Sequence, residues 1–325
     1  MDGWLYTMGA QDFAGGIVIH ITSAVSGLVV CRALGPRRGF DPLGEAFPHS
    51  NLVLSAIGLG MLWVGWFGFN AGSSFAAGAQ ASEAIMNTHA SACCSALAWL
   101  YMSQRNNERG NKPSFIAVMN GSIAGLAAIT PAAGAFIASF FFVVFFVLHS
   151  VTILQFLCVF VLRSSSPLSR LSTAGYVGIG SSMIIGVVGG LLSHWSCHVI
   201  RERLRIDDAL EVSSVHGISS IVGTLSVGLF AYRGIKSGTA MPYNTCHAAS
   251  HTPRVGAGLA DGRGLFFGGG FELFFIQLMA ILVSAAWSVG VTWIIIEGLQ
   301  RAGLQLRPPE GHEEHGIDFV SHGER

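Results

Sequence analysis

The sequence predicts an all-α protein that crosses a membrane several times. Of its 325 residues, 51% are hydrophobic and only 11% are charged, whereas a soluble domain carries about 25% charged residues. The apolar residues gather in segments long enough to cross about 30 Å of hydrocarbon. The 42 glycines agree with this class, because small residues let helices pack closely in a bilayer. With 18 basic and 18 acidic residues the chain has no net charge, which argues against a nucleic-acid partner.

Seven apolar segments are predicted to span the membrane. In order along the chain they lie at residues 13–34, 51–70, 83–103, 114–133, 175–200, 209–232 and 272–299. Together they form a predicted transmembrane domain over residues 1–306, which is followed by a tail over residues 307–325.

Basic residues bound alternate spans and predict how the chain is oriented. They are Arg32, Arg37 and Arg38 after the first span, Arg105, Arg109 and Lys112 after the third, Arg201, Arg203 and Arg205 after the fifth, and Arg301, Arg307 and Arg325 after the seventh. Loops with such an excess face the cytoplasm. We therefore expect a multi-pass protein of the plasma membrane, with a cytoplasmic C-terminal tail and an N-terminus on the outside.

An eighth apolar stretch, from Phe136 to Leu162, differs in kind from these seven. It lacks the glycines of its neighbours, is rich in Phe and Val, and is followed by a Ser-rich run before Ala174. One more simple crossing here would reverse the orientation of everything that follows. We therefore predict that residues 134–174 are an insertion, either a retained intron translated in frame or a genuine lineage-specific insertion.

Two histidines inside apolar segments are the leading candidates for a functional site. His20 stands eight residues after Asp12, His216 stands eight residues after Asp208, and small residues follow each histidine. An ionisable side chain inside a membrane span is unfavourable unless it faces a cavity or a partner. For one histidine alone, a core residue bonded to a neighbouring carbonyl is the simpler interpretation. Two in matching settings indicate an internal repeat with its site at the repeat interface, as in transporters.

The sequence does not predict an enzyme, a metal site or a cofactor site. It contains no nucleophile–base arrangement, phosphate-binding loop or HExxH motif. Its six cysteines have no metal-ligand spacing, and we interpret them as small packing residues.

Seven motifs, in register along the chain, resemble those of the ammonium transporter (Amt/Mep/Rh) family. They are Asp12 to Gly16 with His20, Gly65 to Ser73, Asn87-Thr88, Gly121 to Leu126, Ile129 to Ala132, Asp207-Asp208 with Val215 to Gly217, and Gly316 to Glu324 in the tail. The first motif favours the Amt/Mep branch.

The resemblance implies a fold of eleven spans, built as two inverted five-helix halves and a final helix, in trimers with one pore per subunit. The seven spans of this chain correspond to the fifth through eleventh, so the chain resembles the C-terminal two-thirds of the family. The preceding spans would supply one of two gate phenylalanines and the tryptophan of the outer cation site. Trp4 is too close to Asp12 to be that tryptophan.

The resemblance also implies roles for five residues. His20 and His216 would be the pore pair, which takes a proton from ammonium and guides the neutral amine onward. Removing the charge matters because an unpaired cation is strongly disfavoured in a low-dielectric tube, and K⁺ has no proton to give. Ser73 would be a ligand of the outer cation site, and Phe69 a gate that is otherwise an ordinary packing aromatic. Asp12 would support the outer site electrostatically or act as a helix N-cap.

The function predicted from these observations is passage of ammonium or methylammonium through a twin-histidine pore, by a homotrimer in lipid. Three alternatives remain open at this point. One is an ammonium sensor of the same fold that does not transport. The second is a channel for water or gas, and the third is an inactive, truncated or incorrectly assembled gene product.

Overall fold

The computed structural model describes residues 3–43, 51–106, 112–134, 178–231, 263–309, 311–312, 320 and 322–323. Within these residues every regular element is a helix and there is no strand, so the predicted all-α class is confirmed. The predicted insertion, apart from Gly134, lies outside the described residues, as does most of the predicted tail.

Seven long helices coincide with the seven predicted spans. They are α2 (Thr22–Leu34) with the preceding π-helical turn η1 (Gly16–Ile21), α3 (Leu52–Gly72), α4 (Ala79–Arg105), α5 (Phe115–Ile129), α8 (Ile179–His198) with the following π-helical turn η4 (Val199–Arg203), α9 (Ser219–Phe230) with the preceding π-helical turn η5 (Ser213–Ile218), and α10 (Glu272–Arg301). A short helix, α1 (Trp4–Met8), and a 3₁₀ turn, η6 (Leu265–Phe267), lie outside the spans.

Five of these helices are long and apolar enough to cross a membrane. They are Gly16–Leu34, Leu52–Gly72, Ile179–Arg203, Ser213–Phe230 and Glu272–Arg301. The other two differ for separate reasons. The helix α4 has 27 residues but buries polar side chains along its length, and α5 has only 15 residues.

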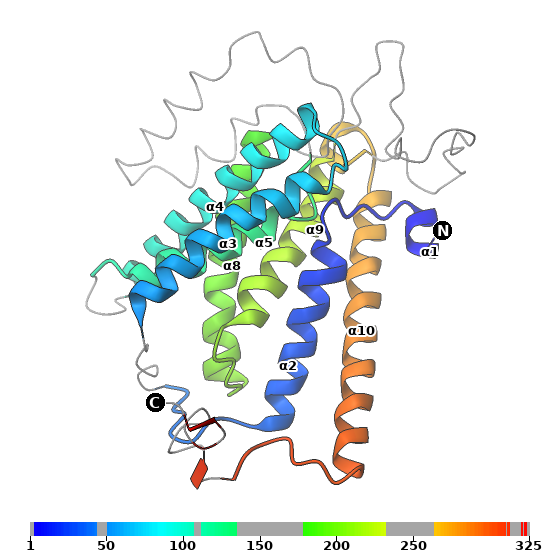
Figure 1. Ribbon diagram of the computed structural model, residues 1–325. Coiled ribbons are helices and arrows are strands. Elements are labelled where there is room, and N and C mark those ends of the chain that lie inside the picture. Colours follow the sequence, from blue (N-terminus) through cyan, green and yellow to red (C-terminus); the bar gives the residue numbers. More distant parts are fainter. Residues whose placement is uncertain are drawn as a thin grey trace.

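The helices that carry the two histidines lie next to each other and run in opposite directions. In Figure 1, α2 starts near the N-terminus and descends, whereas α9 starts at the opposite end and rises. The helix α10 lies alongside α2, while α3, α4 and α5 are tilted against the rest of the bundle. This antiparallel pair is the arrangement expected of an inverted repeat.

Glycines let α4, α5 and α8 approach one another closely. A Cβ added at Gly125 would come within 2.5 Å of the Ser91 carbonyl oxygen and 2.7 Å of the Ala92 Cα, both in α4. One added at Gly186 in α8 would collide with the same Ser91 backbone. Because only hydrogen fits at these positions, the three helices pack backbone to backbone, as is common in membrane bundles.

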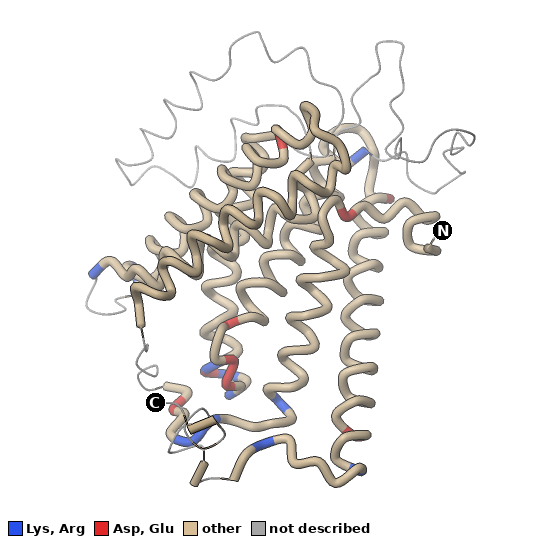
Figure 2. Tube along the Cα trace, in the orientation of Figure 1, with Lys and Arg blue, Asp and Glu red and all other residues tan. Residues whose placement is uncertain are grey.

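Charged residues are frequent along the chain at the end of the molecule where α2 and α10 finish (Figure 2). There the guanidinium of Arg37 donates two hydrogen bonds of 2.7 Å to the carboxylate of Asp207, and the Arg37 backbone N–H donates a third of 2.9 Å. This ion pair ties the segment after α2 to the segment between α8 and η5.

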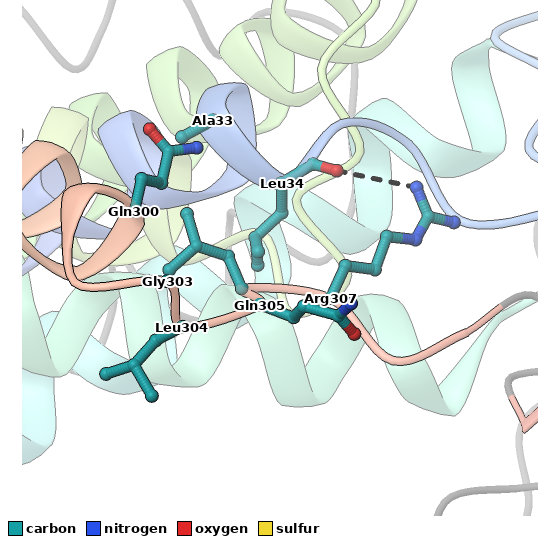
Figure 3. A pocket seen from close by; sticks show the side chains of 8 residues that line it. Ala33, Leu34, Gln300, Gly303, Leu304, Gln305 and Arg307 are labelled. Carbon is teal, nitrogen blue, oxygen red and sulfur yellow. Dashed lines mark hydrogen bonds between the residues drawn. The ribbon is translucent and has the colours of Figure 1, made fainter.

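The segment after α10 returns to the end of α2. Arg307 donates a hydrogen bond of 3.4 Å to the carbonyl oxygen of Leu34, the last residue of α2 (Figure 3). A pocket of about 450 Å³ lies between the two segments, with Ala33, Leu34, Gln300 and residues 303–307 around it. It is built from other residues than the histidine site described below, so we do not assign it to that site.

Candidate functional site

Each candidate histidine lies in a π-helical turn that begins a span. His20 belongs to η1 and His216 to η5. Single π-helical turns are rare and are often found at functional sites. The two halves of the chain therefore present their histidines in the same local structure, which periodicity in the sequence alone does not reveal.

An aspartate caps each of these turns. The carboxylate of Asp12 accepts hydrogen bonds from four successive backbone N–H groups, Gly15 to Val18, at 2.7 to 3.3 Å. Asp208 accepts one from the backbone N–H of Ser213 at 2.8 Å, the same length and the same five-residue interval as the bond from Ile17 to Asp12. The Asp–His interval therefore corresponds to a capping contact that fixes the start of each turn.

The two imidazole rings lie together in the interior. Their centroids are 5.2 Å apart and their planes are inclined by 29°. His20 is buried and His216 is half-buried. Within the described part of the chain, Nε2 of His20 and Nδ1 of His216 are buried and have no hydrogen-bond partner. A buried polar atom without a partner is unfavourable, so both ring nitrogens are candidates to bind a polar ligand.

Aromatic side chains of α3 cover this pair. The indole of Trp66 stacks on His20, with centroids 5.1 Å apart, and lies nearly parallel to His216 at 6.0 Å. The ring of Phe69 is 6.0 Å from His20 and meets Trp66 edge to face at 5.9 Å. The predicted gate residue thus adjoins the histidine pair and remains 37% exposed.

The side chains of Ser73 and Asp12 already form hydrogen bonds with the backbone. Ser73 follows the end of α3, and its hydroxyl donates to the carbonyl oxygen of Phe69 at 2.9 Å. Its oxygen can still accept a hydrogen bond, which is what a ligand of ammonium must do. Both carboxylate oxygens of Asp12 accept capping bonds, so the structure supports the capping interpretation directly.

Two residues of this site, Trp66 and Thr130, lie inside the motifs Gly65 to Ser73 and Ile129 to Ala132 but carry no role predicted from the sequence. The Trp66 indole N–H donates a hydrogen bond of 3.1 Å to the Thr130 hydroxyl, and both residues are buried. A signal for Trp66 was present, because it stands three residues before Phe69 and so shares a helix face with it. Thr130 stands in the motif Ile129 to Ala132, but its contact with Trp66 joins two different helices, and no local pattern predicts such a contact.

The arrangement of apolar antiparallel helices defines a polytopic membrane protein with a polar site in its interior. The chain belongs to the Ammonium Transporter Family, whose sequence profile matches residues 1–145 and 171–325. The family recognised from the motifs is thereby confirmed. It is a family of membrane transporters, not of enzymes.

Curated relatives from distant organisms match nearly the whole chain. Ammonium transporter 1 of Dictyostelium discoideum is 34% identical over 99% of this chain and 55% of its own length. The ammonium transporter of Bacillus subtilis is 31% identical, and here the match covers 99% of this chain and 62% of the relative. The chain therefore spans less than two thirds of the length of these relatives.

Solved structures show the same fold. The crystal structure of Candida albicans Mep2 is 28% identical and matches with a TM-score of 0.63 over 92% of this chain and 52% of that one. For Saccharomyces cerevisiae Mep2 the values are 27% identity and a TM-score of 0.61, over 92% and 53%. A structure described as a sensor Amt protein matches with a TM-score of 0.71 over 98% and 62%, but at 22% identity this likeness concerns the fold alone.

Proposed function

We propose that this chain forms a route for ammonium across a membrane and that His20 and His216 accept the proton that ammonium loses. One observation carries the proposal. Two imidazoles from oppositely directed helices stack at 5.2 Å, and each has a buried nitrogen without a partner among the described residues. A neutral imidazole nitrogen with a free lone pair can accept a hydrogen bond and a proton from ammonium.

The proposed sequence of events follows the side chains from Ser73 inward. An ammonium ion donates a hydrogen bond to the Ser73 hydroxyl oxygen and then passes Phe69, whose ring face attracts a cation. At the histidine pair the ion transfers a proton to a vacant imidazole nitrogen and leaves as ammonia. The imidazolium then releases that proton to solvent, which restores the neutral ring for the next ion. The neutral molecule crosses the apolar interior without the desolvation penalty that the ion would meet. Methylammonium retains N–H bonds and should follow the same route.

We also propose that the chain assembles as a homotrimer in the plasma membrane, with the C-terminal end in the cytoplasm. Large apolar side chains on α3 and α10 are exposed, among them Met61, Val64, Trp287 and Ile294. Lipid or neighbouring subunits must cover such surfaces in a membrane. The basic residues at the end where α2 and α10 finish support the orientation.

Uptake of labelled methylammonium by proteoliposomes that contain the chain tests the proposal. We expect His20→Ala and His216→Ala to abolish uptake or to admit K⁺, because no group remains to take the proton. The matched control is His89→Ala, since His89 lies on an exposed face of α4 and contacts Trp63 instead of the histidine pair. Unchanged uptake and unchanged selectivity in both pore variants would refute the mechanism.

The same preparation separates transport from sensing. A sensor would bind methylammonium, measured by calorimetry, but would give no uptake in the unaltered chain. That combination of results would replace the proposed route with the sensor interpretation, and the histidine variants would then be expected to weaken binding.

A further inference from the structure

The C-terminal end of α5 contacts α3, α9 and the segment that leads into η1. The carbonyl oxygen of Pro131 accepts a hydrogen bond from the Phe13 backbone N–H at 3.0 Å, and that of Thr130 accepts one from Ala14 at 3.2 Å. These bonds hold the segment that leads into η1, which carries His20. The motif Ile129 to Ala132 therefore has a position in the site that the proposed route does not explain.

The helix α9, which follows the turn that carries His216, also contacts the end of α5. The hydroxyl of Ser220 in α9 donates to the carbonyl oxygen of Ala127 in α5 at 3.0 Å. At Gly223, one turn further, an added Cβ would collide with the carbonyl oxygen of Ala128. The backbone of α9 is thus in direct contact with the end of α5.

The side chain of Thr130 links the end of α5 to a third helix, α3. Its hydroxyl donates to the Leu126 carbonyl oxygen at 2.8 Å and accepts from the Trp66 indole N–H at 3.1 Å. The relative exposure of Thr130 is 0% and that of Trp66 is 6%. Because the hydroxyl directs its hydrogen at the Leu126 carbonyl oxygen, a lone pair of the hydroxyl oxygen is free to accept the indole N–H. The Thr130 hydroxyl and the Trp66 indole therefore both have a fixed orientation.

The orientation of the Trp66 indole constrains that of the two imidazoles, because the indole stacks on both rings. Its plane is inclined by only 18° to the ring of His20 and by 14° to the ring of His216. A rotation of the indole about its side-chain bonds would therefore collide with one ring or open a gap beside the other.

We propose that Thr130 is a positioning residue, which sets the alignment of the His20 and His216 rings by holding the indole of Trp66. In this proposal Thr130 takes no part in proton transfer. The role of this alignment in transport rests on the proposed function, but the alignment itself does not. Proton transfer is sensitive to such alignment, since a misplacement of about 1 Å can reduce a rate by about 10²-fold.

The test compares three variants by nitrogen-15 magnetic resonance of histidine-labelled chain in lipid nanodiscs. Thr130→Val keeps the shape of the side chain but removes the acceptor, and we expect the imidazole signals of His20 and His216 to shift or broaden. Thr130→Ser restores the hydroxyl and should restore the unaltered signals. Trp66→Phe lacks the indole N–H and should resemble Thr130→Val.

The matched control is Thr224→Val. Thr224 is equally buried, and its hydroxyl has no hydrogen-bond partner among the described residues. Its variant should leave both imidazole signals unchanged. If Thr130→Val leaves them unchanged as well, or if Thr224→Val shifts them equally, Thr130 has no specific positioning role and the inference is overturned. Should Thr130→Val fail to fold, Trp66→Phe and Thr130→Ser decide the matter by the same signals.

Methylammonium uptake supplies a second readout. We expect Thr130→Val to reduce uptake by between about tenfold and 100-fold, with recovery in Thr130→Ser. The two proposals can fail separately. Shifted signals with no effect of the histidine variants on uptake would refute the proton-transfer route alone, whereas unshifted signals would refute the role of Thr130 alone.

Discussion

At the scale of single residues, two aspartates cap the π-helical turns that carry the two histidines. Asp12 and Asp208 each bond, at 2.8 Å, to the backbone N–H five positions ahead. A carboxylate at this position satisfies N–H groups that the start of a helix leaves without partners. The interval of eight residues between aspartate and histidine could be found in the sequence, and its physical meaning is a cap followed by a π-helical turn.

The Arg37–Asp207 ion pair belongs to the same scale and predicts a dependence of stability on pH. Burial raises the pKa of the Asp207 carboxyl, but the hydrogen bonds and charge of Arg37 outweigh it, so that this pKa lies below its usual value. The side chain of Asp207 is 4% exposed and that of Arg37 is 46% exposed. Partial exposure screens the pair and limits what it contributes.

We expect the contribution of Asp207 to be fully present above its unfolded-state pKa of about 3.9 and to disappear as pH falls through the lower folded-state pKa. Thermal unfolding in detergent, followed by circular dichroism between pH 7 and pH 2.5, measures it. Asp207→Asn should unfold at a lower temperature than the unaltered chain at pH 7, and the difference should shrink below about pH 4. The double variant with Arg37→Gln should be little worse than either single variant. A constant difference at every pH would contradict this.

At the scale of helices, spans follow directly from composition, because an apolar run of sufficient length is stable only as a helix in lipid. All seven predicted spans are helical in the structure. Several bounds differ from the predicted ones by a few residues, and those of α4 and α5 are instructive. The helix α4 continues to Arg105, and α5 stops at Ile129, where Thr130 and Pro131 form a turn. The predicted span over 114–133 is thus too long at its end, and the residues that form a turn instead contribute contacts to the site.

Close helix packing makes a prediction for Gly125. A methyl group there would meet the backbone of Ser91 and Ala92, and an excess of volume at a packed interface destabilises by about 1–3 kcal/mol. We expect Gly125→Ala to lower the unfolding temperature in detergent. The matched control is Gly58→Ala in α3, where a Cβ has open space and higher helix propensity should slightly stabilise. Equal effects at both sites would show that the close contact is unimportant.

At the scale of the whole molecule, the predicted insertion stays a prediction. The family profile matches residues on both sides but none between 146 and 170, a gap that falls inside the predicted range of 134–174. Spans on either side of an additional crossing would have opposite orientations, whereas basic residues follow the first, third, fifth and seventh spans. These two observations support an insertion that does not cross the membrane as a simple span.

Sequencing of full-length transcripts distinguishes the two origins considered for the insertion. If it is a retained intron, we expect a class of spliced transcripts in which codons 134–174 are absent and the reading frame continues at Gly175. A genuine insertion gives transcripts that all contain these codons. Reads that cover the codons from Thr130 to Gly180 are sufficient. Reads from the neighbouring exons serve as the internal control for coverage.

The sequence by itself determined the helical class, the positions of the seven helices, the family and the paired histidines, because each depends on apolar runs or on short motifs. It could not determine that the two imidazoles stack, that Trp66 lies against both, or that Thr130 holds Trp66. These contacts join residues from α3, α5, η1 and η5. They join residues far apart in the sequence, so they are decided by the packing of the whole bundle rather than by any one segment.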